Sequence, residues 1–167
     1  MNLPLPQDPD LSQERPVSHS SPFHTPGRVL ALDVGGRRVG VAMSDSQSML
    51  ASPLTTLNAK PRERLLTNIV ALVHEHGVDT IVVGLPLTME GTVGPQARLV
   101  QSFAAELEHA LGQQVHLFDE RFTSVVAEQM MRDLGVKPAR RKERIDEVAA
   151  SIILQDYLDH TRSNTRE

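Results

Sequence analysis

The feature that most constrains the fold is residues 29–45, VLALDVGGRRVGVAMSD, in which two apolar runs flank a pair of glycines. Short runs rich in Val and Leu are typical of strands. Gly35 and Gly36 accept the positive φ that suits a tight turn, so we predict a β-hairpin. Asp33 interrupts the first apolar run, and burying its carboxylate is costly unless a partner compensates the charge. The sequence therefore predicts a hairpin whose first strand carries a functional carboxylate.

The rest of the chain alternates between helical and strand-like patterns. Apolar residues recur at helical spacing over four segments, which are 61–76, 95–111, 124–134 and 145–160. Further strands are predicted at 52–58, 80–86 and 114–120. A hairpin followed by β–α alternation is typical of an α/β fold, here a mixed five-stranded sheet with helices on both faces.

Composition limits the number of domains and the environment of the protein. The 167 residues are enough for one domain with a full core. Residues 1–27 contain six of the 11 prolines and are predicted to be a disordered leader. The domain is expected at 28–160, followed by a frayed tail at 161–167. The absence of cysteine excludes disulfides and thiolate metal sites, and no apolar run approaches the length of a membrane helix, which favours a cytoplasmic location.

Three acidic residues stand where the predicted elements begin or end. Asp33 lies in the first strand, Glu120 ends the last strand, and Asp146 lies at the start of the final helix. Taken singly, each has an ordinary explanation. Asp33 could form the turn before Gly35, and Asp146 could cap the final helix. Glu120 could face solvent or pair with a basic residue such as Arg121. If the first, fourth and fifth strands are parallel, however, their ends meet at one edge of the sheet. A divalent cation is the usual remedy for clustered carboxylates, which favours Mg²⁺ or Mn²⁺ and phosphodiester hydrolysis.

A local basic segment is the candidate surface for nucleic acid. The formal net charge of −4 gives the chain no global attraction for polyanions. Residues 137–144, KPARRKER, form a predicted loop directly before Asp146. Such a run is often only a solvated face, but beside a metal site it could contact phosphates without reading sequence. Its basic residues are Lys137, Arg140, Arg141, Lys142 and Arg144.

Four motifs resemble the YqgF family, known also as RuvX, of pre-16S ribosomal RNA nucleases and Holliday-junction resolvases. The first motif is DVGGRRVGVAMSD and the second is VGLPLTMEGT, followed by Gln96 and Phe103. The third motif is DERFTS, and the last is IDEVAASIILQDYL. The resemblance covers residues 28–159 and implies a ribonuclease H-like fold.

The resemblance also implies roles for individual residues. Asp33, Glu120 and Asp146 would be the catalytic, metal-binding acids, and Arg38 would face nucleic acid. Supporting roles are implied for three motif residues, which are Gly35, Ser44 and Arg121. Many nucleases of the wider ribonuclease H-like group have a carboxylate at the end of the fourth strand, where this chain has Gly84. Glu120 would then reach across from the fifth strand.

These expectations define a metal-dependent endonuclease, a hydrolase that matures the 5′ end of pre-16S ribosomal RNA in the cytoplasm. RNA is favoured over four-way DNA as the partner, possible ribosomal partners are implied, and the expected state is a monomer or a weak dimer. One alternative is a Holliday-junction resolvase, which normally cuts as a symmetric dimer. Another is a non-catalytic nucleic-acid-binding domain of the same fold. An actin-like ATPase or sugar kinase is disfavoured, because one domain lacks the second wall of such a nucleotide site.

Overall fold

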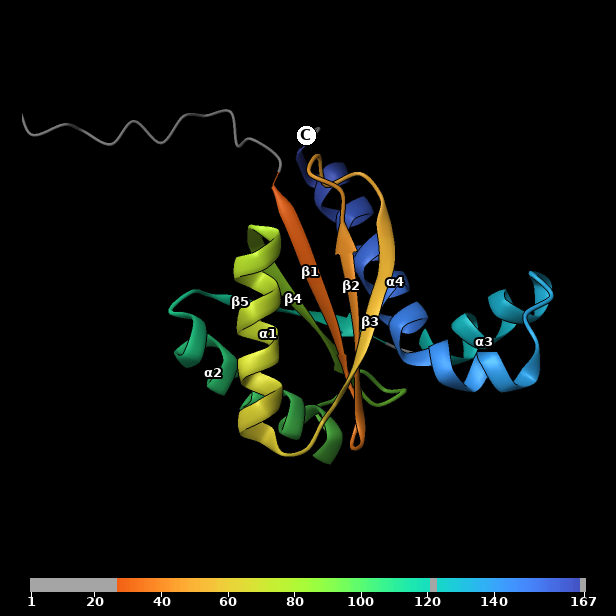
Figure 1. Ribbon diagram of the computed structural model, residues 1–167, viewed down its shortest axis with the longest axis horizontal. Helices are drawn as coiled ribbons and strands as arrows, with labels where there is room; N and C mark the ends of the chain where they lie inside the picture. The colour runs from red at the N-terminus through yellow and green to blue at the C-terminus, as the bar shows by residue number, and fades with distance from the viewer. Residues whose placement is uncertain (1–26, 121–122, 166–167) are drawn as a thin grey trace, which may run out of the picture.

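The computed structural model describes residues 27–120 and 123–165, with side chains described outside 123–125. These residues form one five-stranded sheet and four helices (Figure 1). The strands are β1 (Arg28–Val34), β2 (Arg38–Ser44), β3 (Ala51–Asn58), β4 (Val78–Pro86) and β5 (Val115–Glu120). The helices are α1 (Arg62–His76), α2 (Pro95–Leu111), α3 (Thr123–Asp133) and α4 (Pro138–Thr165). Residues 1–26 of the predicted leader lie outside the described residues, as does Arg121.

The sheet has the mixed topology that the sequence predicts. The strand order is β3-β2-β1-β4-β5, with β2 antiparallel to both β1 and β3. Strands β1, β4 and β5 are parallel, so their carboxyl ends meet at one edge. Helices α1 and α2 cover one face and α4 crosses the other, while α3 and the first turns of α4 project to one side (Figure 1). The prediction of helices on both faces is confirmed.

Two apolar clusters, one on each face of the sheet, show which face each buried strand residue packs on. Leu30 and Leu32 of β1 belong to the larger cluster, which packs beneath α1 and α2. Val29 and Ala31 belong to the smaller cluster, which packs beneath α4. Because successive strand residues point to opposite faces, Asp33 falls on the α4 face. Burial of the neighbouring residues therefore fixes the side on which this carboxylate must lie.

The turn between β1 and β2 forms for a reason that differs from the prediction. Neither Gly35 nor Gly36 has a positive φ. Instead, the Gly35 amide donates to the carbonyl oxygen of Arg38 at 2.9 Å, and an added Cβ at Gly35 would lie 2.8 Å from that same oxygen. Close approach of the backbone, rather than backbone handedness, is why glycine suits position 35.

The last helix is longer than predicted at both ends. Helix α4 begins at Pro138, so the basic segment expected as a loop is helical. Proline is compatible with the first helical position, and the Arg141 amide already donates to the carbonyl of Lys137 at 3.0 Å. Asp146 therefore lies about two turns inside the helix rather than at its start. Residues 161–165, expected as the start of a frayed tail, are part of this helix in the structure.

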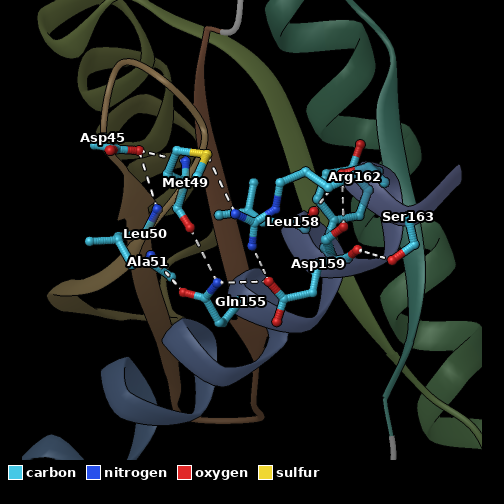
Figure 2. Close-up of polar contacts among 11 residues, drawn as sticks. Asp45, Met49, Leu50, Ala51, Gln155, Leu158, Asp159, Arg162 and Ser163 are labelled. Atoms are coloured by element: carbon cyan, nitrogen blue, oxygen red, sulfur yellow. Dashed lines mark hydrogen bonds and ion pairs between the residues drawn. The ribbon is translucent and has the colours of Figure 1, made fainter. Parts of the chain in front are cut away.

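A polar network anchors the carboxyl-terminal half of α4 to the loop between β2 and β3 (Figure 2). Gln155 accepts from the Ala51 amide at 3.0 Å and donates to the carbonyl oxygen of Met49 at 3.3 Å. Asp45 holds the same loop by accepting from the amides of Met49 at 2.7 Å and Leu50 at 3.3 Å. These contacts fix the helix against the sheet at the end remote from Asp33. In the described part of the chain, no helix has the length and apolar character needed to cross a membrane.

Candidate active site

The fold brings the three predicted acids to one region on the α4 face of the sheet. Asp33 lies near the carboxyl end of β1, Glu120 ends β5, and Asp146 lies on α4. Burial, as the largest cause, and the negative charges of Glu120 and then Asp146 together raise the pKa of Asp33 from 3.8 to about 7. The two charges act on Asp33 because all three carboxylates share this region. The site therefore concentrates negative charge that a cation would relieve.

Asp146 reaches the sheet because α4 lies directly on β2 at Gly40. Gly40 pairs with Asp33 across the hairpin, and a Cβ added to Gly40 would lie 1.9 Å from the carbonyl oxygen of Asp146. Any larger residue would push the helix away. The Asp146 carboxylate accepts a 2.7 Å hydrogen bond from Nε of Arg38 at the start of β2. The contact of helix and strand thus creates an ion pair between a predicted metal ligand and a predicted nucleic-acid-binding residue.

Glu120 leans back over β4, as the resemblance implies. Gly84 pairs with Phe118 in the parallel register, two residues before Glu120. Nevertheless, a Cβ added to Gly84 would lie 2.7 Å from Oε2 of Glu120. The carboxylate therefore occupies the space above Gly84, on the side of β5 that faces β1.

The acids do not form a ready-made metal cage. In the described residues, no group of three His, Cys, Asp or Glu side chains is placed so that it could hold a metal ion. One oxygen of the Asp146 carboxylate, Oδ2, is engaged by Arg38.

The remaining predicted residues are placed differently. Ser44 is buried at the far end of β2, where its hydroxyl accepts from the Val29 amide at 2.8 Å and donates to the Asp45 carbonyl at 3.0 Å. It is a packing and hydrogen-bonding residue away from the acids. Gly35 shapes the hairpin turn beside Arg38. In the basic segment Arg141 is half-buried, whereas four residues are exposed, namely Lys137, Arg140, Lys142 and Arg144.

Sequence reasoning missed the packing roles of two strand glycines. The first motif contains Gly40 and the second contains Gly84, yet only the contacts show that one receives a helix backbone and the other a carboxylate. A signal was present, because glycine inside a strand often marks a close approach of another group. What approaches, however, depends on the packing of α4 and β5.

Comparison with known proteins places the chain in a family. A family model described as RuvX, Holliday junction resolvase, matches residues 27–160. A protein of Chloroflexus aurantiacus strain J-10-fl, named "Putative pre-16S rRNA nuclease", is 63% identical over 136 residues, which cover 81% of this chain and 89% of that protein. A protein of the same name from Roseiflexus strain RS-1 is 58% identical, over 82% of this chain and 97% of its own length.

The fold also has a solved counterpart. RuvC of Thermus thermophilus, in complex with a Holliday junction substrate, superposes with a TM-score of 0.53 at 15% identity, over 83% of this chain and 97% of that chain. At this identity the similarity concerns the fold, and it confirms the ribonuclease H-like architecture expected from the sequence. By its family-model match and its close relatives, this chain belongs to the RuvX family.

Proposed function

We propose that this protein is a metal-dependent endonuclease that hydrolyses phosphodiester bonds at the 5′ end of pre-16S ribosomal RNA. The observation that carries the proposal is the convergence of Asp33, Glu120 and Asp146 on one face of the sheet, close enough for two of the charges to raise the pKa of Asp33. The names of the closely similar relatives support the choice of reaction and substrate.

The residues present fit a hard divalent cation such as Mg²⁺ or Mn²⁺. Their donor atoms are all carboxylate oxygens, which these ions prefer. Burial and then the charges of Glu120 and Asp146 raise the pKa of Asp33, and a cation would stabilise its charged form. Asp33, Glu120 and Asp146 would hold it, with Asp146 exchanging its contact with Arg38 for the metal. When bound, the cation would activate water and stabilise the leaving oxygen.

The side chains of the site contribute in other ways. Without metal, burial and the neighbouring acids raise the pKa of Asp33 to about 7, and a bound cation would favour its ionised, metal-binding form. Arg38 is 45% exposed and lies beside the acids, where its guanidinium can turn to a substrate phosphate once Asp146 releases it. Both groups are positioned by short contacts between β1, β2 and α4.

The first turns of α4 provide the phosphate-binding surface in this proposal. They project from the sheet together with α3 (Figure 1). Asp146 follows about two turns after the start of the helix. Lys137, Arg140 and Lys142 are exposed there, and they would neutralise phosphates that flank the scissile bond. Arg144 is engaged with Glu147 at 2.8 Å, so its contribution requires release from that pair.

RNA is the favoured substrate, and a four-way DNA junction is the second candidate. The names of the relatives favour ribosomal RNA, whereas the family description and the RuvC fold favour a junction. Junction cleavage requires two sites on a symmetric dimer, while processing of an RNA strand requires one. We therefore propose a monomer or a weak dimer that acts in the cytoplasm, where ribosomal partners would present the precursor.

The test is cleavage of a labelled ribosomal RNA precursor and a four-way DNA junction in parallel, with Mg²⁺ or Mn²⁺. Asp33→Asn, purified identically, controls for contaminating nucleases. Metal-dependent cleavage of the precursor that disappears in Asp33→Asn is the expected result. Cleavage of the junction alone would select the resolvase. Binding that is unchanged in EDTA, with no cleavage of either substrate, would favour a non-catalytic binding domain.

A further inference from the structure

The space above Gly84 has a steric consequence for the position of Glu120. A Cβ at position 84 would lie 2.7 Å from Oε2 and 3.4 Å from Cδ of Glu120. Real Cβ atoms essentially never lie within 3.0 Å of a heavy atom of a residue that is not their neighbour in the chain. Any side chain at position 84 would therefore occupy the volume that the Glu120 carboxylate fills. Only a glycine leaves that volume to the carboxylate.

This volume lies between the strands that carry Asp33 and Glu120. The register between β1 and β4 pairs Leu32 with Val83, so Gly84 lies beside Asp33. Val82 packs on the α4 face, and Gly84, two residues further, presents its face to the same side. A carboxylate from β5 that lies above β4 is thereby brought toward β1. The contribution of Glu120 to the raised pKa of Asp33 agrees with this placement.

We propose that Gly84 is a positioning residue, whose lack of a side chain lets Glu120 reach across β4 to share a cation with Asp33. The inference rests on the proposed function, since it concerns how that metal site is assembled. The backbone itself does not demand glycine, because Gly84 has no positive φ and keeps regular pairing with Phe118. Glycine inside a strand is otherwise unfavourable, so the requirement comes from the site.

The neighbours of Gly84 explain why substitution should affect the site more than the fold. The added Cβ would meet the ends of two flexible side chains, Glu120 and Ile153, whose Cδ1 lies 2.7 Å away. Both ends can rotate without moving the backbone. We therefore expect Gly84→Ala to fold normally while its Glu120 carboxylate is displaced. Gly36→Ala is a matched control, because its added Cβ meets no atom within 4 Å.

The experiment compares Mn²⁺ affinity by calorimetry, thermal unfolding and steady-state cleavage of the precursor. Gly84→Ala should weaken Mn²⁺ binding by about tenfold or more, the usual range when support for a metal ligand is lost. It should lower kcat with little change in KM for RNA, and it should melt as the wild type does. A crystal structure of the variant should show the carboxylate displaced. Wild-type affinity and kcat in Gly84→Ala would overturn the proposal.

Two double variants distinguish whether Gly84→Ala acts by displacing Glu120 or by displacing Ile153. Gly84→Asp combined with Glu120→Ala places a carboxylate in the same volume from β4, and it should bind Mn²⁺ more tightly than Glu120→Ala alone. Failure to recover affinity would count against the proposal. Ile153→Val removes the other contacted atom, so restoration of activity by Ile153→Val in the Gly84→Ala protein would assign the effect to Ile153 and overturn it.

The proposed function can fail separately. If Glu120→Ala alone leaves Mn²⁺ binding and cleavage unchanged, Glu120 is not part of the site and both proposals fall. If Mn²⁺ binding depends on Glu120 and Gly84 but neither substrate is cleaved, the positioning role stands and the nuclease function is lost.

Discussion

Arg38 and Asp146 form an ion pair across 108 positions of the chain, with Nε 2.7 Å from Oδ2. The pair joins the start of β2 to α4, and it gives Asp146 a cationic partner in the absence of metal. Its side chains are 45% and 22% exposed, so water screens the interaction. The contact therefore matters more for the chemistry of the site than for the stability of the fold.

Arg38→Ala is expected to tighten Mn²⁺ binding to the free protein. The substitution removes a positive charge that competes with the metal for Asp146, and it should cost less than about 1 kcal/mol of unfolding free energy, as exposed pairs do. Calorimetry with Mn²⁺ and urea unfolding measure the two effects. Arg37→Ala removes an adjacent exposed charge and is the control. Equal Mn²⁺ affinity in the two variants would show that the Arg38 contact does not compete with metal.

Asp33→Asn is expected to remove a pH dependence of stability in metal-free buffer. The pKa of Asp33 is raised to about 7 in the folded protein, by burial first and then by Glu120 and Asp146. The folded state therefore binds this proton more tightly than the unfolded chain, and the free energy of unfolding falls as the pH rises from about 4 to about 7. The loss can reach about 4 kcal/mol, at about 1.4 kcal/mol per pKa unit.

Urea unfolding at pH 5 and pH 8 in EDTA measures this effect. The wild type should lose more stability than Asp33→Asn between the two values, because asparagine has no proton to release. Groups that do not interact with Asp33 cancel in the comparison. The same loss in both would contradict a raised pKa at Asp33.

The basic start of α4 is expected to contribute to RNA binding through phosphate contacts. Replacing Arg140, Arg141 and Lys142 by alanine should weaken binding and reduce the slope of affinity against salt, since fewer counterions are released. Affinity for the precursor at several salt concentrations is the measurement. A matched triple variant removes three exposed charges of the α1 and α2 side, namely Lys60, Arg64 and Arg98. If the two triple variants change RNA affinity and its salt dependence equally, the start of α4 is not part of the RNA-binding surface.

Gly40→Ala is expected to destabilise the fold, in contrast to Gly84→Ala. Its added Cβ would lie 1.9 Å from the Asp146 carbonyl oxygen and 2.9 Å from the Glu147 amide nitrogen. These are backbone atoms, so α4 itself must shift, at a cost of about 1–3 kcal/mol. Thermal unfolding beside Gly36→Ala checks this. An unchanged melting temperature would mean that α4 adjusts freely on β2.

Much of the architecture could be predicted from local patterns. The span 95–111 was predicted as a helix and α2 has these bounds, because its apolar spacing and the glycines on either side are local signals. The strand β1 was likewise predicted from its apolar run, and in the structure Asp33 lies on the α4 face with Val29 and Ala31, opposite Leu32. Patterns failed where a signal had two meanings. The glycines of the hairpin suggested positive φ, but neither has it. The charged run after Lys137 suggested a loop, but it forms the first turns of α4.

The sequence by itself determined the strands, most of the helices and the family motifs that contain Asp33, Glu120 and Asp146. The tertiary structure decided what those acids meet: Arg38 for Asp146, and the empty space above Gly84 for Glu120. The physical reason is that periodicity and capping are properties of neighbouring residues, whereas these contacts depend on how strands are ordered and where α4 crosses them. Both Gly40 and Gly84 are strand glycines, and the sequence near them does not tell them apart. Only the packing shows that the α4 backbone contacts Gly40 and that the Glu120 carboxylate lies over Gly84.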